Sequence, residues 1–181
     1  MSTLKIQKTS KILAVCLRML CIILLVVTMA EIAAILWLTQ VSGDETPAAI
    51  NTMSSIFLQH TDHSDYVKSD LMITFSGDVV RLCLIMVILF IAGWIFKDIS
   101  KDYTPFVAKH MKRLKRISLL IAGMAIIPGV VEMAMIQIVT PAAKVNVSFE
   151  LFYILVAVVF FCLAQIFDYG RMLQQQSDET L

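Results

Sequence analysis

Three ionisable residues, Glu31, Arg81 and Glu132, stand within long apolar runs of the 181-residue sequence. A charged side chain in the hydrocarbon of a membrane is costly, so such residues are usually paired or functional. An arginine between two carboxylates would allow all three to be buried together, provided that the fold brings them to one depth. Two interpretations follow: a buried polar tie that fixes the register of the helices, or a pathway for ions or protons.

A second group of candidate ligands lies between residues 60 and 65. His60 and His63 are interleaved there with Asp62 and Asp65, residue types that bind divalent cations or respond to pH. Their spacing matches no zinc motif, so a solvated polar loop is the simpler interpretation, and we predict no metal site.

Motifs of known catalytic mechanics are missing from the sequence. It holds no GxSxG, HExxH or P-loop pattern, and no pair of carboxylates placed for catalysis in an aqueous pocket. The four cysteines all fall within apolar runs and none forms a CxxC pair, which favours packing over disulfides or metal binding. We therefore predict a protein that is not an enzyme and that needs no cofactor.

The elements that would position these residues are membrane helices. The chain has 59% hydrophobic and 16% charged residues and a mean hydropathy of +0.82, whereas soluble domains carry roughly 25% charged residues. The long apolar runs predict helices, because open strand edges are not tolerated in hydrocarbon. We expect an all-α integral membrane protein, a single domain over residues 1–181, whose four transmembrane helices form an antiparallel bundle. The expected spans are 12–38, 79–96, 117–139 and 149–167, with a kink at Pro128.

Charge asymmetry between the flanks predicts the orientation. The first 11 residues contain three lysines and no acid, and the connection 97–116 contains seven basic and two acidic residues. The connection 39–78 contains one basic and six acidic residues. By the positive-inside rule, residues 39–78 lie outside, and both termini lie in the cytoplasm.

The basic inner segment 97–116 resembles an interfacial helix. Thr104 and Pro105 form a helix start. An apolar stripe follows at helical spacing, made of Phe106 or Val107, His110 or Met111, and Leu114. The surrounding basic residues suit anionic lipid head groups, or an acidic protein partner, while direct nucleic-acid binding is not expected because the cluster is short. The candidates for contact in this segment are Pro105, Phe106, Lys112, Arg113, Lys115 and Arg116.

The C-terminal stretch LAQIFDYGRMLQQQSDETL, residues 163–181, begins at the predicted cytoplasmic surface. Apolar residues continue at helical spacing beyond the lipid, so we expect the fourth helix to project at least to Leu173. The acids near the end of the tail 168–181 lie within reach of the basic segment, although an exposed contact of this kind contributes only about 0–1 kcal/mol. The candidates for contact in the tail are Gly170, Leu173, Gln174, Asp178 and Glu179.

Two of these stretches carry a resemblance to a known family. TPFVAKHMKRLKRIS, residues 104–118, and the C-terminal stretch resemble the two cytoplasmic motifs of a bacterial four-span family described as domain of unknown function 2975. Two positions depart from that pattern, since Gln165 stands where it would place Glu and Tyr103 where it would place Gly. The matching residues of the second motif are Ile166, Phe167, Gly170, Leu173, Gln174, Asp178, Glu179, Thr180 and Leu181.

The resemblance implies an integral membrane protein without established enzyme activity, encoded beside a small helix-turn-helix transcription regulator. It suggests a membrane component that holds or releases that regulator at its cytoplasmic face. The alternative is a small transporter or immunity-type protein that uses the cluster of Glu31, Arg81 and Glu132, and association of several copies is compatible with either hypothesis.

Overall fold

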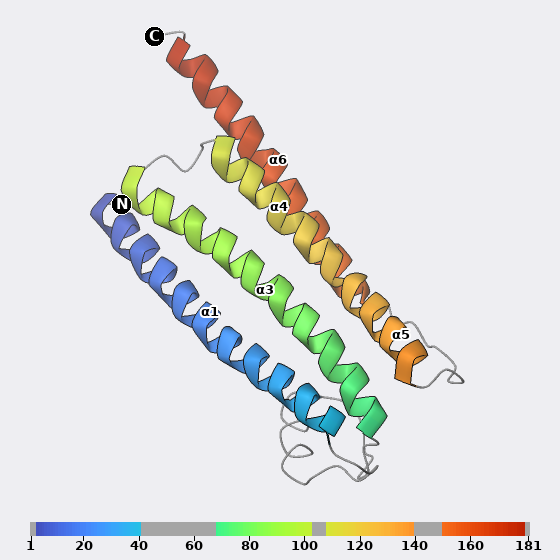
Figure 1. Ribbon diagram of the computed structural model, residues 1–181. Helices are drawn as coiled ribbons and strands as arrows, with labels where there is room; N and C mark the ends of the chain where they lie inside the picture. The colour runs from blue at the N-terminus through green and yellow to red at the C-terminus, as the bar shows by residue number, and fades with distance from the viewer. Residues whose placement is uncertain (1–2, 41–67, 103–107, 140–149, 180–181) are drawn as a thin grey trace.

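The computed structural model describes residues 3–40, 68–102, 108–139 and 150–179, and these parts of the chain are entirely helical apart from a turn and a terminal residue (Figure 1). The helices are α1 (Thr3–Gln40), α3 (Lys68–Asp102), α4 (Ala108–Met124), α5 (Ile127–Val139) and α6 (Leu151–Glu179). Four helical stretches are long and apolar enough to cross a membrane: Lys8–Gln40, Leu71–Lys101, Ala108–Val139 and Leu151–Leu173. An all-α fold with four such stretches was predicted and is confirmed.

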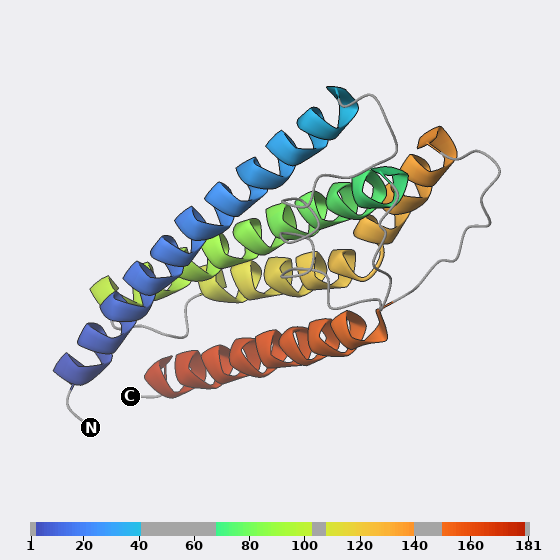
Figure 2. The same ribbon diagram turned by 90° about the horizontal axis from the view of Figure 1, so that it is seen from below.

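The helices lie in a row, in the order α1, α3, α4 with α5, and α6 (Figures 1 and 2). Leu38 near the end of α1 packs with Leu71 and Phe75 near the start of α3. Cys21, half-way along α1, approaches the carbonyl oxygen of Met86, further along α3, at 4.0 Å. Contacts between α1 and α3 therefore run in opposite order along the two helices.

The second packed pair is α4 and α6. Ile117 and Ile121 of α4 are buried against Ala157 of α6, and the hydroxyl of Ser118 donates a hydrogen bond to the Ala157 carbonyl oxygen at 2.8 Å. The small side chain at position 157 lets this hydroxyl reach the α6 backbone, an arrangement typical of packed membrane helices. These buried contacts between α4 and α6 hold α6 against the rest of the molecule.

Many apolar side chains point away from these seams. Leu119, Ile138, Leu151 and Phe152 are each at least 70% exposed. Large apolar side chains with this exposure cannot face water in such numbers, but they suit contact with lipid. The burial pattern thus agrees with helices that pack along narrow seams inside a membrane.

Two helix boundaries differ from the sequence prediction. Helix α3 begins at Lys68, so the last part of the expected connection 39–78 is helical; Leu71 and Phe75, one turn apart, extend the apolar seam against α1. Helix α4 runs from Ala108 to Met124 without a break, so its basic part is continuous with the third span and is no separate interfacial helix. His110, Leu114 and Ile117 lie on one face of the helix across that junction, and this continuous face explains why the helix does not break there.

The break between α4 and α5 lies where Pro128 predicted a kink. The amide of Ala125 donates to the carbonyl oxygen of Ala122 at 3.2 Å, and the amide of Ile126 donates to that of Gly123 at 3.1 Å. These tightened bonds end α4, and Pro128 is then fully buried in the first turn of α5, where its missing amide hydrogen is tolerated. The break sets the direction of α5, which carries Glu132.

Helix α6 continues beyond the expected fourth span as far as Glu179. The prediction that this helix extends at least to Leu173 is confirmed. Figure 1 shows its C-terminal turns running past the start of α4. Below, the "basic end" is the end of the molecule that holds the end of α3, the start of α4 and the end of α6. The "acidic end" holds the end of α1, the start of α3, the end of α5 and the start of α6.

Candidate functional site

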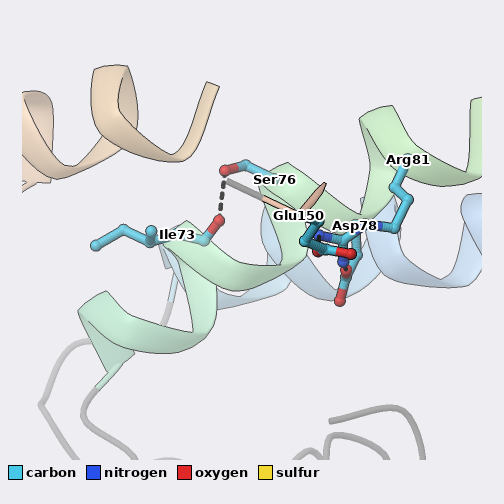
Figure 3. A network of polar contacts seen from close by, with 5 residues as sticks. All are labelled: Ile73, Ser76, Asp78, Arg81 and Glu150. Carbon is cyan, nitrogen blue, oxygen red and sulfur yellow. Dashed lines mark hydrogen bonds and ion pairs between the residues drawn. The ribbon is translucent and has the colours of Figure 1, made fainter. Parts of the chain in front are cut away.

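Arg81 organises a network of polar contacts at the acidic end (Figure 3). Its guanidinium donates to Asp78, one turn earlier on α3, at 2.8 Å and to Glu150, at the start of α6, at 3.0 Å. The two bonds use different nitrogens, so one arginine joins α3 to the residue that precedes α6. The guanidinium therefore links elements that are 69 residues apart in sequence.

Glu132 of α5 lies against Gly77 of α3. A Cβ atom added at Gly77 would lie 2.6 Å from Cγ and 2.8 Å from Cδ of Glu132, and would also crowd its Oε1. The absence of a side chain at Gly77 therefore admits the glutamate between the two helices. In this position Glu132 interacts electrostatically with Arg81, and also with the carboxylates of Asp78 and Glu150.

Glu31 is the most deeply buried carboxylate of the group. It is 6% exposed, and its Oε2 has no hydrogen-bond partner within the described parts of the chain. Its strongest charged neighbour is Asp78. The Nε atom of Arg81 is likewise buried and unpaired among the residues that the structure describes. Glu31 thus stands next to the Arg81 network without a direct hydrogen bond from it.

We call these five residues the polar cluster of the acidic end: Glu31, Asp78, Arg81, Glu132 and Glu150. Exposure of the side chains rises from the buried Glu31 through Asp78 and Arg81 to Glu150, which is 46% exposed. Four carboxylates face one guanidinium, so their formal charges do not cancel. Charge that stays unbalanced within hydrocarbon is costly. Within the described residues, no three His, Cys, Asp or Glu side chains are arranged to hold a metal ion.

Ion pairs also tie the helices together at the basic end. Asp98 of α3 accepts hydrogen bonds from Arg113 at 2.7 Å and pairs with Lys109 at 3.1 Å, both on α4. The Arg113 guanidinium stands over the Trp94 ring, 5.5 Å from its centroid, a cation–π contact. Because the Arg113 side chain is only 13% exposed, it acts in packing and is no free contact residue.

The basic face of α4 meets α6 through Lys115, whose Nζ lies 3.8 Å from Asp168. Asp168 also accepts a hydrogen bond from Arg171 at 3.3 Å, one turn further along α6. Asp168 thus contacts the basic face of α4, whereas the sequence analysis predicted this contact for Asp178 and Glu179 at the end of the tail. Figure 1 shows the end of α6 beyond the start of α4.

The other predicted contact residues are distributed as follows. Lys112 and Arg116 are exposed on α4, Gly170 is half-buried, and Leu173 and Glu179 are exposed on α6. Gln174 and Asp178 lie within α6, and the structure describes only their backbone. His60, His63, Pro105 and Phe106 lie outside the described residues.

The sequence analysis identified the charged residues of the cluster, but it missed the residues that contact them. Asp78 stands three residues before Arg81, a spacing that brings side chains together on a helix and could have indicated the pair. Glu150 could have been found from topology, because it starts the fourth span at the same end. No signal in the sequence marks Gly77 as the residue that makes room for Glu132.

Comparison with known proteins adds no relative: no family model, no curated protein and no solved structure matches the chain.

Proposed function

We propose that the chain is a non-enzymatic, multi-pass protein of a bacterial cytoplasmic membrane, with a regulatory or binding role at its cytoplasmic face. Its four spans would form an antiparallel arrangement with both termini inside, because the basic connection 97–116 and the lysines before residue 12 then lie on the cytoplasmic side. The start of α4 and the projecting end of α6 would form the binding surface, and the polar cluster of the acidic end would lie in the opposite half of the membrane.

The observation that carries this proposal is the projection of α6. The helix extends to Glu179, past the start of α4, and Lys115 and Asp168 hold the two helices together at its base. Met172 and Leu173 are each nearly half exposed on this projection. Exposed apolar residues next to basic ones suit an amphipathic, acidic segment of another protein. A helix end that served only stability would gain little from exposed apolar side chains.

The proposed occupant of this surface is a small helix-turn-helix regulator, the partner that the resemblance of the two cytoplasmic motifs suggests. Binding at the membrane would keep such a regulator away from DNA. Release would follow a change in helix packing, since α4 and α6 join the basic end to the rest of the molecule. No direct contact of this chain with nucleic acid is involved.

The test is recruitment of a fluorescent fusion of the regulator encoded beside this gene. With the full chain expressed, the fusion should concentrate at the membrane. The double variant Lys112→Glu/Arg116→Glu should release it to the cytoplasm, as should deletion of 174–181, because each removes part of the surface. Lys101→Glu, which reverses an exposed charge on the last turn of α3, is the matched control and should retain recruitment. Equal recruitment by all variants would refute the proposal.

A second candidate function, transport or coupling of protons or cations, is favoured by one observation: Glu31 is buried next to Asp78 with an unpaired carboxylate oxygen. In proteoliposomes, a conductive role predicts proton or cation flux that Glu31→Gln and Glu132→Gln abolish and that Glu179→Gln leaves unchanged. The regulatory proposal predicts no flux above that of empty liposomes, so the measurement separates the two.

A further inference from the structure

A small groove of about 50 Å³ lies between α1 and α3, which run side by side (Figures 1 and 2). The described residues that line it include one cation, Arg18 of α1. One water needs about 10–15 Å³ of such space, so the groove admits a compact group of a few non-hydrogen atoms, such as a phosphate, and no acyl chain. The remaining lining residues are Ala14, Cys21, Leu89, Phe90, Gly93 and Trp94.

The guanidinium of Arg18 lacks a partner within the described part of the chain. No carboxylate among the described residues forms an ion pair with it. Arg18 belongs to the apolar stretch Lys8–Gln40 and stands about 15 Å along the helix from the start of that stretch, at 1.5 Å per residue. An arginine at this depth is costly unless its charge reaches a partner, so a negatively charged group from outside the chain would stabilise it.

The surroundings of the groove on α1 are apolar and exposed. Val15, Met19 and Ile22, which are neighbours of Arg18 on this helix, are each more than half exposed. Large apolar side chains with this exposure in a membrane span contact acyl chains. A ligand that reaches Arg18 therefore comes from the bilayer, and it must carry a negative charge to pair with the guanidinium.

The wall on α3 places the groove near the membrane surface at the basic end. Trp94 is 44% exposed, and tryptophans in membrane helices are enriched at the level of the head groups. The Phe90 and Trp94 rings, whose centroids are 4.6 Å apart, form an aromatic wall. Gly93 leaves space beside them, because a Cβ atom added there would meet nothing within 4 Å. The long stem of Arg18 can lie in this apolar setting while its guanidinium reaches toward the head groups.

From this geometry we infer that Arg18 binds the phosphate of an anionic phospholipid from the leaflet next to the basic end, with the phosphate seated in the groove between α1 and α3. The charge that selects this ligand stands in the groove itself, and the acyl chains would lie along the exposed apolar side chains of α1. A zwitterionic lipid binds less well, because its own cation repels the guanidinium. The site shares no residue with the proposed protein-binding surface and does not depend on that proposal.

The experiment is native mass spectrometry of the full chain released from nanodiscs that contain equal amounts of phosphatidylglycerol and phosphatidylcholine with identical acyl chains. The wild-type chain should retain one phosphatidylglycerol in preference to phosphatidylcholine. Arg18→Gln should lower this preference about fivefold, the change expected for one basic residue near an anionic surface. Arg18→Lys keeps the charge and should retain most of the preference. Lys101→Gln, the matched control, removes an exposed cation from the last turn of α3 and should leave the preference unchanged.

A pair of steric variants tests the groove itself. Gly93→Leu should fill the groove and abolish the preference, and it should fold because the new Cβ atom meets nothing within 4 Å. Ala33→Leu adds bulk at an exposed position of α1 toward the acidic end and should retain the lipid. Should Gly93→Leu fail to fold, Ala14→Leu on the opposite wall serves the same purpose. Equal retention of the two lipids by the wild-type chain, equal losses in Arg18→Gln and Lys101→Gln, or unchanged retention by a folded groove-filled variant would overturn the inference.

Discussion

Replacing Gly77 by alanine tests the close approach of α3 and α5 that buries Glu132. The new Cβ would lie 2.6 Å from Cγ and 2.8 Å from Cδ of Glu132, and Cγ is near the backbone, so it cannot swing away as a side-chain tip can. Forcing an extra methyl group into a packed seam costs about 1–3 kcal/mol. Alanine is also the better helix former, by about 1 kcal/mol, and this gain opposes the loss.

The variant Gly93→Ala separates the effect of the contact with Glu132 from the effect of alanine's higher helix propensity. Gly93 lies on the same helix, and a Cβ added there meets nothing within 4 Å. Both variants share the gain in propensity, so Gly77→Ala should be less stable than Gly93→Ala by about 1–3 kcal/mol. Reversible unfolding in mixed micelles, followed by helical circular dichroism, measures both free energies of unfolding.

The clash is specific to one partner, which a double-mutant cycle can show. In a Glu132→Ala background, the methyl group at position 77 has room, so the penalty of Gly77→Ala should disappear. If Gly77→Ala is as stable as Gly93→Ala, or if its penalty persists without the Glu132 side chain, the proposed packing of α5 on α3 is wrong.

Four further variants address the other contacts, each through the same unfolding measurement. Asp98→Asn should destabilise the protein by about 1.5–3 kcal/mol, because it leaves the largely buried Arg113 without its carboxylate partner. Lys109→Gln, a change at an exposed residue, should cost less than about 1 kcal/mol. Equal costs would contradict the stronger pairing of Asp98 with Arg113. Ser118→Ala should destabilise by about 0.5–1.5 kcal/mol through loss of the bond to Ala157, and no loss would show that this hydroxyl does not hold α4 to α6. Glu31→Gln should not destabilise, because Oε2 has no partner to lose in the described chain; a loss above about 1 kcal/mol would reveal a partner for this carboxylate.

Long-range features of the sequence predicted the fold well. Continuous apolar runs identify spans because the backbone must satisfy its own hydrogen bonds in lipid, and all four runs are helices. Pro128 marked the break between α4 and α5 because its ring cannot continue the α4 ladder. Helix ends were less predictable, since Leu71 extends α3 by packing on α1, a contact that hydropathy alone does not reveal.

The candidate site was predicted in part. Glu31, Arg81 and Glu132 were identified because a charge in an apolar run is conspicuous, but the residues that hold Arg81 were not. Glu150 lies just before α6, where acids are common and carry no special signal, whereas the spacing of Asp78 from Arg81 could have indicated that pair. The role of Gly77 depends on the separation of two helices, which no local pattern encodes.

The most direct test of the proposed cytoplasmic binding surface is the accessibility of a single cysteine at position 173. In a chain whose four native cysteines are replaced, Leu173→Cys should resist a membrane-impermeant maleimide in intact cells and react in inverted membrane vesicles, because Leu173 is exposed on the projection of α6. Adding the purified helix-turn-helix regulator to those vesicles should slow the reaction, and the Lys112→Glu/Arg116→Glu background should remove this protection. Labelling of intact cells, or a reaction rate that the regulator does not change, would contradict the proposal.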